Sequence, residues 1–542
     1  MKIVIIGGVA GGATAAARLR RLDEKAEIVL LERGEHISFA NCGLPYFIGG
    51  EIKEEAKLLL QTPKGFGERY QVDVRILHEV TAIDRKLKQL TVKNLKEESE
   101  FALSYDKLLL ATGAAPRELQ LAGIDRESVF TLRNVADAKR IKAFIENKQG
   151  LRALVIGGGS IGIEMTENLS KAGVEVTLTE SSPQILPQLD PELAAVATRE
   201  LERNQVKIHL GASVDQIDKH KIDMVILSAG TTPDTALAKA AGLDLSNSGA
   251  IVVDDTMRTS DPDIYAVGDA VQIEHFVLHS PMTGGLAGPA NKQGRIAADN
   301  ITGNKSHYKA SQTSAVVRVF DLTVATTGIN EKQAKANGLN YDKIYLLPNN
   351  HASYFPDFCQ LIIKVLYDRD SQLLLGAQVL GKEGADKRCD VFATAQRAGM
   401  KAAELADIDL CYAPPYGSAK DPINMAGYVM ENLITGKVKQ FHWHDVDSLP
   451  RDGSVTLLDT RSPQEYAAGH IKGFVNLPLQ ELHQRYGELD INKPVYITCA
   501  VGMRGYLACR ILMQHGFDCY NLAGGYKLLF EIGAYSSLEF TQ

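Results

Sequence analysis

Two cysteines stand in sequence contexts where a thiol could do chemistry. Cys499 directly follows an apolar run, residues 495–498, and lies a short loop before a helical pattern over residues 506–515. A cysteine between the end of a strand and the start of a helix is surrounded by free backbone N–H groups, which stabilise a thiolate or a persulfide anion. This pattern predicts a site that carries sulfur.

The second cysteine is Cys42, in the segment SFANCGLPY of residues 38–46. The next cysteine in the chain is Cys359, so Cys42 has no sequence neighbour with which to store two electrons as an internal disulfide. A single redox thiolate cycles either through a mixed disulfide with a small thiol or through a sulfenic acid. The residues leave both alternatives open.

The other cysteines show no metal-binding pattern. The chain has 7 cysteines and 13 histidines, without the paired spacing of a zinc site, so we predict no metal centre. Their wide spacing is typical of a protein in a reducing compartment, which favours the cytoplasm. We expect five of them to be packing residues: Cys359, Cys389, Cys411, Cys509 and Cys519.

The elements that must position Cys42 begin at the N-terminus. Residues 2–6 predict a strand and residues 13–22 a helix, and the turn between them contains Gly7, Gly8, Gly11 and Gly12. Small residues let the backbone approach a pyrophosphate, whose charge meets the helix N-terminus. Val9 stands where the second glycine of the usual pattern lies, but the next strand, residues 27–31, ends in Glu32, which can accept hydrogen bonds from a ribose.

The same pattern recurs in the middle of the chain. The strand of residues 153–156 leads into Gly157, Gly159 and Gly162, and the next strand, residues 175–179, ends in Glu180. Two such fingerprints predict two dinucleotide sites. Glu180 is followed by two serines rather than by a cation, so a 2'-phosphate would meet a carboxylate without a counter-charge. The second site therefore favours NADH over NADPH.

A third segment predicts a flavin. Residues 259–270, TSDPDIYAVGDA, place Asp269 at the end of an apolar strand, where a carboxylate can hold the ribityl chain of FAD. Residues 105–116 and 223–234 are strands that end in small residues. With these motifs, the first 430 or so residues resemble the two-dinucleotide flavoprotein disulfide reductase family. The resemblance implies an FAD domain split around an inserted NADH domain, followed by an interface domain that makes a homodimer.

The resemblance also implies which residues contact FAD and NADH. The expected FAD contacts are Gly7, Ala10, Gly11, Glu32, Arg33, Asn41, Val80, Ala111, Thr112, Gly113, Arg133, Gly268, Asp269 and Ala287. The expected NADH contacts are Gly157, Gly159, Ile161, Gly162, Glu180 and Gly230.

Within that family, SFANCGLPY resembles the coenzyme A disulfide reductase branch. The C-x4-C pair of glutathione reductase and its relatives is absent after Cys42. NADH peroxidases and oxidases share the single cysteine but typically carry a histidine in the first glycine turn, where this chain has Ala10. The resemblance favours NADH-driven reduction of coenzyme A disulfide, coenzyme A persulfide or polysulfide. An NADH oxidase or peroxidase, with Cys42 as a sulfenic acid, is the alternative.

Coenzyme A carries phosphates, so its site should offer cations and hydrogen-bond donors. Arg18 and Arg21 share a face of the first helix, and Asn291 and Arg295 share a face of a later one. The resemblance implies that these four residues and Ser38 bind coenzyme A.

Reduction of a disulfide needs a proton for the departing thiolate, and a phenol near the sulfur can donate it. In the resembling family two tyrosines reach in from the partner subunit, and the matching positions are Tyr354 and Tyr412. Tyr416 and Tyr428 are near neighbours of Tyr412 and alternatives to it.

The C-terminal residues carry a series of short motifs: Asp459 with Arg461, Glu465 with Tyr466, residues 469–471, Cys499 with Gly502 and Arg504, and residues 522–526. With these motifs they resemble the rhodanese, or sulfurtransferase, family. The loop from Cys499 to Arg504 has the sulfurtransferase length of six residues, and the resemblance implies that both residues are catalytic. Gly505 departs from the serine usual after the arginine, which removes one hydroxyl cap but leaves the backbone of the loop. Asp459 and His470 are expected to be structural.

Composition and charge bound the remaining alternatives. The 542 residues are 45% hydrophobic and 23% charged, as in ordinary globular domains, and the net charge of −7 offers no basic surface for nucleic acid or an anionic membrane. No run of 18 apolar residues predicts membrane insertion. Small-molecule thiols and persulfides are the expected partners, and a sulfur-delivery or redox-sensing protein is the non-reductase alternative.

We therefore expect an α/β chain with two Rossmann-like domains, an α+β interface domain and an α/β rhodanese domain. The expected ranges are 1–110 with 245–305 for FAD, 111–244 for NADH, 306–432 for the interface, 433–445 for a linker and 446–542 for the rhodanese domain.

Overall fold

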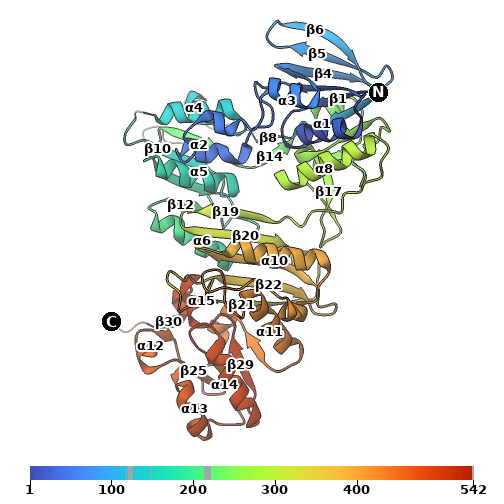
Figure 1. Ribbon diagram of the computed structural model, residues 1–542. Coiled ribbons are helices and arrows are strands. Elements are labelled where there is room, and N and C mark those ends of the chain that lie inside the picture. Colours follow the sequence, from blue (N-terminus) through green and yellow to red (C-terminus); the bar gives the residue numbers. More distant parts are fainter. Residues whose placement is uncertain (118, 120–125, 147, 213–220, 540–542) are drawn as a thin grey trace. The chain divides into compact units, whose positions relative to one another are not determined.

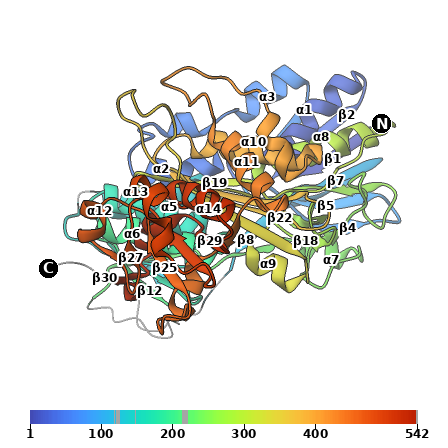
Figure 2. The ribbon, with the colours of Figure 1, turned by 90° about the horizontal axis from the view of Figure 1, so that it is seen from below.

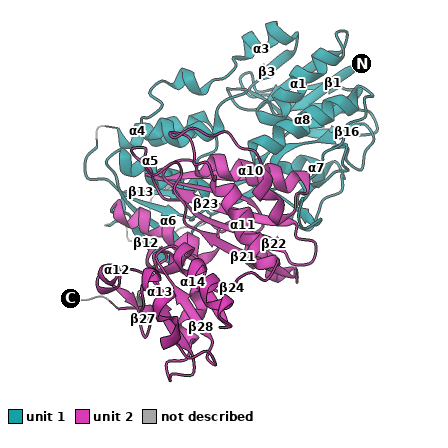
Figure 3. Cartoon of the chain, turned by 60° about the horizontal axis from the view of Figure 1, so that its bottom comes forward, with its two compact units in different colours: residues 1–185, 205–313 teal, residues 186–204, 314–542 magenta. Residues whose placement is uncertain are grey.

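The protein divides into two compact units in a computed structural model (Figure 3). One unit comprises residues 1–185 and 205–313, and the other comprises residues 186–204 and 314–542. The structure describes residues 1–117, 119, 126–146, 148–212 and 221–539. No helix within these described ranges is both long and apolar enough to span a bilayer.

The first unit contains a five-stranded parallel sheet with the order β16-β7-β1-β2-β3. Its strands are β1 (Lys2–Ile6), β2 (Glu27–Glu32), β3 (Asp73–Ile76), β7 (Lys107–Leu110) and β16 (Ile264–Ala266). Helices α1 (Ala10–Leu22) and α8 (Ala287–Ile301) lie side by side (Figure 1). They share one apolar core with the sheet, and a Cβ on Gly294 of α8 would come within 2.3 Å of the Gly11 carbonyl oxygen of α1. Only glycine permits this close approach of two helices.

A second parallel sheet in the same unit has the order β12-β11-β10-β13-β9. Its strands are β9 (Val129–Phe130), β10 (Arg152–Ile156), β11 (Glu175–Glu180), β12 (Lys207–Leu210) and β13 (Met224–Leu227), and α5 (Ser160–Lys171) follows β10. The chain enters and leaves this sheet through β8 (Ala114–Pro116) and β14 (Thr231–Pro233), which pair antiparallel. The first sheet therefore takes strands from before and after the second sheet in the sequence, and the predicted α/β fold with two Rossmann-like domains is confirmed.

Shorter elements complete the first unit. A three-stranded antiparallel sheet contains β4 (His78–Asp84), β5 (Gln89–Asn94) and β6 (Ser99–Ser104). The remaining described elements include α2 (Leu44–Ile48), α3 (Pro63–Tyr70), α4 (Val135–Ile145), α7 (Ala236–Ala240), β15 (Ile251–Val252), β17 (Val271–Glu274) and β18 (Pro281–Met282).

The second unit contains an antiparallel sheet with the order β19-β20-β23-β22-β21. Its strands are β19 (Ala315–Val319), β20 (Leu322–Gly328), β21 (Tyr341–Leu346), β22 (Ile362–Asp368) and β23 (Leu374–Gly381). Helices α10 (Ala385–Ala398) and α11 (Pro422–Ile434) lie against this sheet (Figures 1 and 2) and share its apolar core. The unit also includes α6 (Pro191–Arg203) and α9 (Glu331–Ala336).

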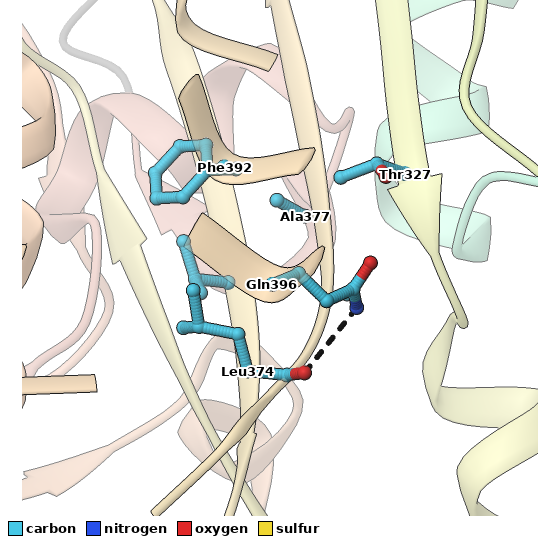
Figure 4. A pocket seen from close by; sticks show the side chains of 7 residues that line it. Thr327, Leu374, Ala377, Phe392 and Gln396 are labelled. Atoms are coloured by element: carbon cyan, nitrogen blue, oxygen red, sulfur yellow. Dashed lines mark hydrogen bonds between the residues drawn. The ribbon is translucent and has the colours of Figure 1, made fainter. Parts of the chain in front are cut away.

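A small space lies between α10 and the strands of this sheet (Figure 4). Gln396 on α10 donates to the backbone carbonyl of Leu374 across it. Its lining residues, none of them charged, are Thr327, Val365, Leu374, Gly376, Ala377, Phe392 and Gln396. We interpret it as a packing gap rather than a substrate site.

A cluster of buried charges ties α6 to the same sheet. The fully buried ammonium of Lys364 lies 2.7 Å from the carboxylate of Asp190, 2.5 Å from Glu192 and 2.5 Å from Glu331. Burial lowers the pKa of Lys364, but Tyr345 and the three carboxylates outweigh burial and raise that pKa well above its ordinary value. The carboxylate oxygens are close enough together to hold a metal ion, but the ammonium already lies between them. The cluster therefore satisfies its own charges.

The second unit ends in a parallel sheet with the order β24-β29-β28-β25-β27. Its strands are β24 (Lys439–Phe441), β25 (Thr456–Asp459), β27 (Val475–Asn476), β28 (Val495–Thr498) and β29 (Cys519–Leu522). A two-stranded antiparallel sheet contains β26 (His470–Ile471) and β30 (Leu538–Glu539). The helices beside these sheets are α12 (Pro463–Ala467), α13 (Leu479–Arg485), α14 (Met503–Gln514) and α15 (Gly525–Glu531).

The structure corrects one expectation in this region. Residues 433–445 were expected to form a linker, but Lys439–Phe441 forms β24, the edge strand of the C-terminal sheet. Val438 and Phe441 are buried in the apolar cores of that domain, which gives the segment a reason to pair despite its polar neighbours. The domain therefore begins earlier than the polar composition suggested.

Candidate active sites

The turn after β1 leaves no room for a side chain at two of its glycines, Gly7 and Gly12. Gly7 has a φ of +99°, and a Cβ there would lie 2.2 Å from the Ala111 carbonyl oxygen. A Cβ on Gly12 would lie 1.9 Å from the Gly7 carbonyl oxygen. The end of β7 and the N-terminus of α1 therefore meet β1 directly, at the switch point of the sheet. This is where a pyrophosphate can approach backbone N–H groups.

The turn after β10 repeats this geometry. Gly157 has a φ of +112°, and a Cβ there would lie 2.3 Å from the Ser228 carbonyl oxygen. A Cβ on Gly162 would lie 1.9 Å from the Gly157 carbonyl oxygen, the same distance as at the first turn. Gly159 faces open space at the start of α5, and so does Gly230. Ile161, the other expected NADH contact, is exposed in the first turn of α5.

Each turn is tied to the glutamate that ends the following strand. A Glu32 carboxylate oxygen accepts a hydrogen bond from the Gly8 backbone at 2.8 Å, and Glu180 accepts one from Gly158 at 2.7 Å. Burial raises the pKa of Glu180, but hydrogen bonds from Gly158 and Ser182 outweigh burial and hold that pKa below its ordinary value. Both carboxylates are thus fixed beside a glycine turn, where the hydroxyls of a ribose can donate to them.

Arg133 connects two of the expected FAD segments. A guanidinium nitrogen of Arg133 lies 2.5 Å from the point where a Cβ on Gly113 would stand, and another lies 4.0 Å from the Asp269 carboxylate. Burial raises the pKa of Asp269, and Arg133 offsets part of that rise. The neighbouring Gly268, with a φ of +81°, donates its N–H to the Gln293 side chain at 2.7 Å. The Asp269 carboxylate therefore lies near Arg133 and directly follows a glycine, which carries no side chain.

Thr112 and Arg33 meet at Asp234. The Thr112 hydroxyl donates to the Asp234 carbonyl at 2.6 Å, and the Arg33 guanidinium donates to its carboxylate at 2.8 Å. The expected FAD contacts that remain lie at the starts of α1 (Ala10, Gly11) and α8 (Ala287), after β7 (Ala111), in β4 (Val80) and beside Cys42 (Asn41).

Cys42 lies in a short 3-10 turn, Asn41–Gly43, directly before α2. The residue is solvent-exposed, but the chain packed around its thiol desolvates the sulfur, which raises the pKa of Cys42. The carboxylates of Glu164 and Asp269 raise that pKa further. Cys42 and the expected flavin ligand Asp269 are thus close enough to interact electrostatically, although 227 positions separate them in the sequence.

Sequence reasoning missed Glu164. It lies on α5, the helix of the second glycine turn, and its carboxylate accepts a hydrogen bond from the Tyr46 hydroxyl at 3.4 Å. Tyr46 belongs to α2, which follows Cys42. The close approach is visible at Gly49, where a Cβ would lie 2.3 Å from the Asn168 side chain of α5. Because no local pattern predicts which helices of two sheets pack together, no sequence signal could have identified Glu164.

The expected coenzyme A residues lie largely on the α1 and α8 helix pair. Arg18 of α1 is paired with Asp299 of α8 at 2.8 Å. The expected residue Asn291 accepts a hydrogen bond from Thr14 at 2.5 Å. Arg21 and Arg295 are exposed on the same two helices. Ser38, with a φ of +44°, donates its backbone N–H to the Gly8 carbonyl at 2.8 Å beside the first turn.

The two expected proton donors meet in the second unit. The Tyr354 and Tyr412 hydroxyl oxygens lie 2.8 Å apart, although 58 positions separate the residues. The hydrogen bond raises the pKa of Tyr354. Both side chains are largely exposed, at 74% and 48%. Tyr416 and Tyr428, the alternatives to Tyr412, are also exposed.

The Cys499 loop encloses its sulfur in backbone. Cys499 is fully buried, and the Gly502 N–H donates to its Sγ at 3.1 Å. Gly502 has a φ of +94° and precedes the first residue of α14. A second helix supports the loop, since the Tyr526 N–H of α15 donates to the Cys499 carbonyl at 2.8 Å. The sulfur thus accepts a backbone N–H at the start of a helix, and the wider set of N–H donors expected from the sequence stays a prediction.

Arg504 is already paired inside the same domain. Two of its guanidinium nitrogens each lie 2.7 Å from a carboxylate oxygen of Glu465. Hydrogen bonding to Arg504 is the main reason that the pKa of Glu465 is lowered to about 2. The buried pair of Asp459 and Arg461, 2.8 Å apart, has no contact with a sulfur among the interactions described, in keeping with a structural role.

The structure corrects part of the expectation for the remaining cysteines. Cys389, Cys509 and Cys519 are buried, and burial raises the pKa of each, to about 12 for Cys389 and Cys519. Cys411, however, is exposed and Cys359 is only half-buried. Both lie in the loops that carry Tyr354 and Tyr412, where the chain leaves the sheet core.

With these sites described, family comparisons identify the chain. A model described as pyridine nucleotide-disulphide oxidoreductase matches residues 1–294. The dimerisation domain of the same group matches residues 314–421, and a rhodanese-like domain matches residues 443–530. The chain belongs to the pyridine nucleotide-disulphide oxidoreductase family and is an oxidoreductase. The family uses FAD and NAD(P)H, and the two glycine turns fit them, because they keep side chains away from backbone that must approach a pyrophosphate.

Similar proteins narrow the class. The chain is 36% identical over 438 residues to the coenzyme A disulfide reductase of Staphylococcus aureus (strain JH9), covering 79% of this chain and 99% of that protein. The crystal structure of reduced Bacillus anthracis CoADR-RHD is 45% identical, with a TM-score of 0.97 over 99% of both chains. An NAD-dependent persulfide reductase from A. fulgidus is 34% identical, with a TM-score of 0.89 over 97% of this chain and 100% of that one.

Proposed function

We propose that this protein reduces coenzyme A disulfide, coenzyme A persulfide or polysulfide at the expense of NADH, and that its C-terminal domain transfers sulfane sulfur. The observation that carries the proposal is a pair of cysteines in opposite settings. Cys42 is a lone exposed thiol beside Asp269, and Cys499 is enclosed in a loop of backbone N–H groups. The names of the similar proteins, a coenzyme A disulfide reductase and a persulfide reductase, support the same chemistry.

The cofactor contacts follow from the geometry of the turns. FAD would lie at the Gly7 turn with Glu32 on its ribose and Asp269 on its ribityl chain. NADH would lie at the Gly157 turn with Glu180 on its ribose. When bound, FAD accepts two electrons from NADH and supplies them to a disulfide. The other expected contacts in each set complete these two sites, and Arg18, Arg21, Ser38, Asn291 and Arg295 would bind coenzyme A.

The chain's own part in the reaction is sulfur and proton chemistry. The Cys42 thiolate attacks one sulfur of the substrate, so that a Cys42–sulfur bond forms and the substrate's sulfur–sulfur bond breaks. The departing thiolate or hydrosulfide takes a proton from the hydroxyl pair of Tyr354 and Tyr412 of the partner subunit. Two electrons and a proton then release the second thiol and regenerate Cys42. The dimerisation domain supports a homodimer in which this pair reaches the neighbouring Cys42.

The second reaction takes place at Cys499. Its thiolate takes a sulfane sulfur from a persulfide donor, which leaves as a thiol, and Cys499 becomes a persulfide. The N–H of Gly502 stabilises this anion, and Arg504 completes the loop. A thiol acceptor such as coenzyme A then takes the sulfur and restores the Cys499 thiolate. The product, a persulfide, is a substrate for Cys42.

We assign the domains as 1–110 with 245–305 for FAD, 111–244 for NADH, 306–432 for the interface and a rhodanese domain extended to include β24. The distribution of strands among the sheets supports these ranges. The scattered cysteines support a reducing compartment and hence a cytoplasmic enzyme.

The decisive experiment is to purify the protein aerobically, denature it and identify the released molecules, while the mass of the Cys42 peptide is measured. FAD together with coenzyme A, free or bound to Cys42 as a disulfide, is the expected result. FAD with a sulfenic or sulfinic Cys42 and no coenzyme A would replace the proposal with an NADH oxidase or peroxidase. Full NADH-driven turnover by a Cys42→Ser variant would indicate a sulfur-delivery or redox-sensing protein.

A further inference from the structure

The residue after Arg504 breaks the pattern of the resembling sulfurtransferases, and the structure shows what takes its place. A Cβ on Gly505 would lie 2.2 Å from the side-chain oxygen of Asn521. Real Cβ atoms essentially never approach another heavy atom so closely, so a serine at position 505 requires the Asn521 amide to move. That amide, from strand β29, stands beside the point where the serine Cβ would lie.

The other end of the same amide holds the Cys499 loop. The Asn521 Nδ2 donates to the Gly502 carbonyl oxygen at 3.1 Å, and that oxygen also accepts the Tyr506 N–H at 2.9 Å. Gly502 is the residue whose own N–H donates to Cys499 Sγ at 3.1 Å. Asn521 therefore fixes the carbonyl of the residue whose N–H donates to the sulfur.

Gly502 needs such a constraint because of its conformation. Its φ of +94° lies in a region that glycine enters freely, and a flexible glycine has other conformations of similar energy. Rotation of its peptide units would turn the N–H away from the sulfur. The hydrogen bond from Asn521, a side chain anchored in a sheet, adds to the one from Tyr506 and favours the conformation that faces Cys499.

An asparagine at position 521 is unfavourable for stability, so we expect it to have a function there. Asparagine is depleted in strands, and β29 is an inner strand of its sheet, between β24 and β28. The Asn521 Oδ1 is buried and has no hydrogen-bond partner among the described residues. An apolar side chain would avoid both penalties but could not hold Gly502.

We propose that Asn521 is a positioning residue for the sulfur chemistry of Cys499, and that Gly505 is required to make room for it. The proposal rests on the proposed role of Cys499 as a sulfur carrier. Asn521 touches neither sulfur nor substrate. It acts through Gly502, whose N–H stabilises the thiolate and the persulfide anion.

The test is a cycle of three variants: Asn521→Ala, Gly505→Ser and the double variant. Asn521→Ala removes one of the two donors to the Gly502 carbonyl, and Gly505→Ser displaces the amide, so each should slow sulfur transfer by about 10-fold. In the double variant the serine has space and supplies a hydroxyl, so its rate should exceed that of either single variant. Asn492→Ala, at an exposed asparagine of the same domain, is the matched control and should leave the rate unchanged.

A second measurement separates positioning from loss of structure. Methyl methanethiosulfonate transfers a small methylthio group to thiolates, and its rate at Cys499 can be followed on the isolated peptide by mass across a pH series. In Asn521→Ala the profile should move to higher pH, because the thiolate loses a fixed donor, whereas loss of packing alone would not shift it. Asn521→Leu, which has a side chain of similar size without a donor and adds no charge, should show the same shift and guards against an unfolded alanine variant.

The outcomes are distinct. An unshifted pH profile in Asn521→Ala and Asn521→Leu, or a double variant slower than both single variants, would overturn the inference. If the wild-type protein modifies normally at Cys499 but transfers no sulfur, the proposed function of this domain fails, while the shift in the profile still decides the role of Asn521.

Discussion

Cys42 and Cys499 lie in surroundings that act on their sulfur atoms in different ways. Cys499 is fully buried, and its Sγ accepts a backbone N–H from Gly502 within the loop before α14. Cys42 is exposed, and its surroundings raise its pKa through desolvation and through the carboxylates of Glu164 and Asp269. The Cys499 sulfur thus accepts a hydrogen bond from the backbone, whereas the surroundings of Cys42 disfavour its anion.

The difference indicates when each thiol must be reactive. A sulfur carrier holds its anion between two encounters, so the stabilising groups must belong to the protein itself. A thiol that reacts only with its cofactors and substrate in place gains from surroundings that keep it protonated and less open to oxidation beforehand. The carboxylates near Cys42 and the backbone N–H that donates to Cys499 match these two requirements.

The largest expected effects come from replacing each of the two cysteines separately. Cys42→Ser should reduce NADH-driven reduction of coenzyme A disulfide by about 1,000-fold or more, because serine cannot form the mixed disulfide. Sulfur transfer through Cys499 should persist. Cys499→Ser should show the reverse, and both activities can be measured on the same preparations. Loss of both activities in either variant would contradict two separate sites.

A substitution at a glycine remote from both sulfur atoms should impair the reaction at Cys42 but not the reaction at Cys499. In Gly162→Ala the new Cβ would lie 1.9 Å from the Gly157 carbonyl, so the second turn must deform and NADH affinity should fall by about 100-fold. The Cys499 reaction uses no NADH and should be unaffected. Stopped-flow reduction by NADH at varied concentration measures the effect. Gly288→Ala on α8, where a Cβ meets no atom within 4 Å, is the control and should bind NADH normally.

Removing a carboxylate near Cys42 should make its thiolate easier to form. Glu164→Gln removes one of the two charges that raise the pKa of Cys42, so that pKa should fall and the pH profile of Cys42 alkylation should shift to lower pH. Desolvation, the largest cause, remains, so the pKa should stay above its ordinary value. The exposed Glu35 offers the control variant Glu35→Gln. A shift to higher pH in Glu164→Gln would contradict the acidic setting.

The sequence predicts the parts of these sites that depend on local backbone. The glycine turns, Glu32, Glu180 and the Cys499 loop follow from strand–turn–helix patterns whose geometry is set within about 30 residues. Glu164 and Asn521 could not be predicted, because each reaches its site by packing between elements distant in sequence. The strand at Lys439–Phe441 escaped prediction for a related reason, since its pairing with β29 depends on buried Val438 and Phe441 rather than on overall polarity.

The smallest expected effect concerns the cation beside Cys499. Arg504 is paired with Glu465, so its charge is balanced within the chain. If backbone donors rather than this cation stabilise the sulfur anion, Glu465→Gln should change the rate of sulfur transfer by less than about 3-fold. A much larger increase would assign the stabilisation to Arg504 instead of to Gly502.

The same variant has a defined signature in stability. The pKa of Glu465 is lowered to about 2, mainly by Arg504, so the pair stabilises the fold above the carboxyl's unfolded pKa and loses that contribution as pH falls toward 2. Because the two side chains are 28% and 40% exposed, solvent screening limits the contribution to about 1 kcal/mol. The free energies of unfolding of the wild type and Glu465→Gln, measured with denaturant, should therefore differ by about this amount at pH 7 and converge between roughly pH 4 and pH 2. A difference that persisted at pH 2 would arise from packing rather than from the ion pair, and Gln464→Ala in the same helix would serve as the neutral control.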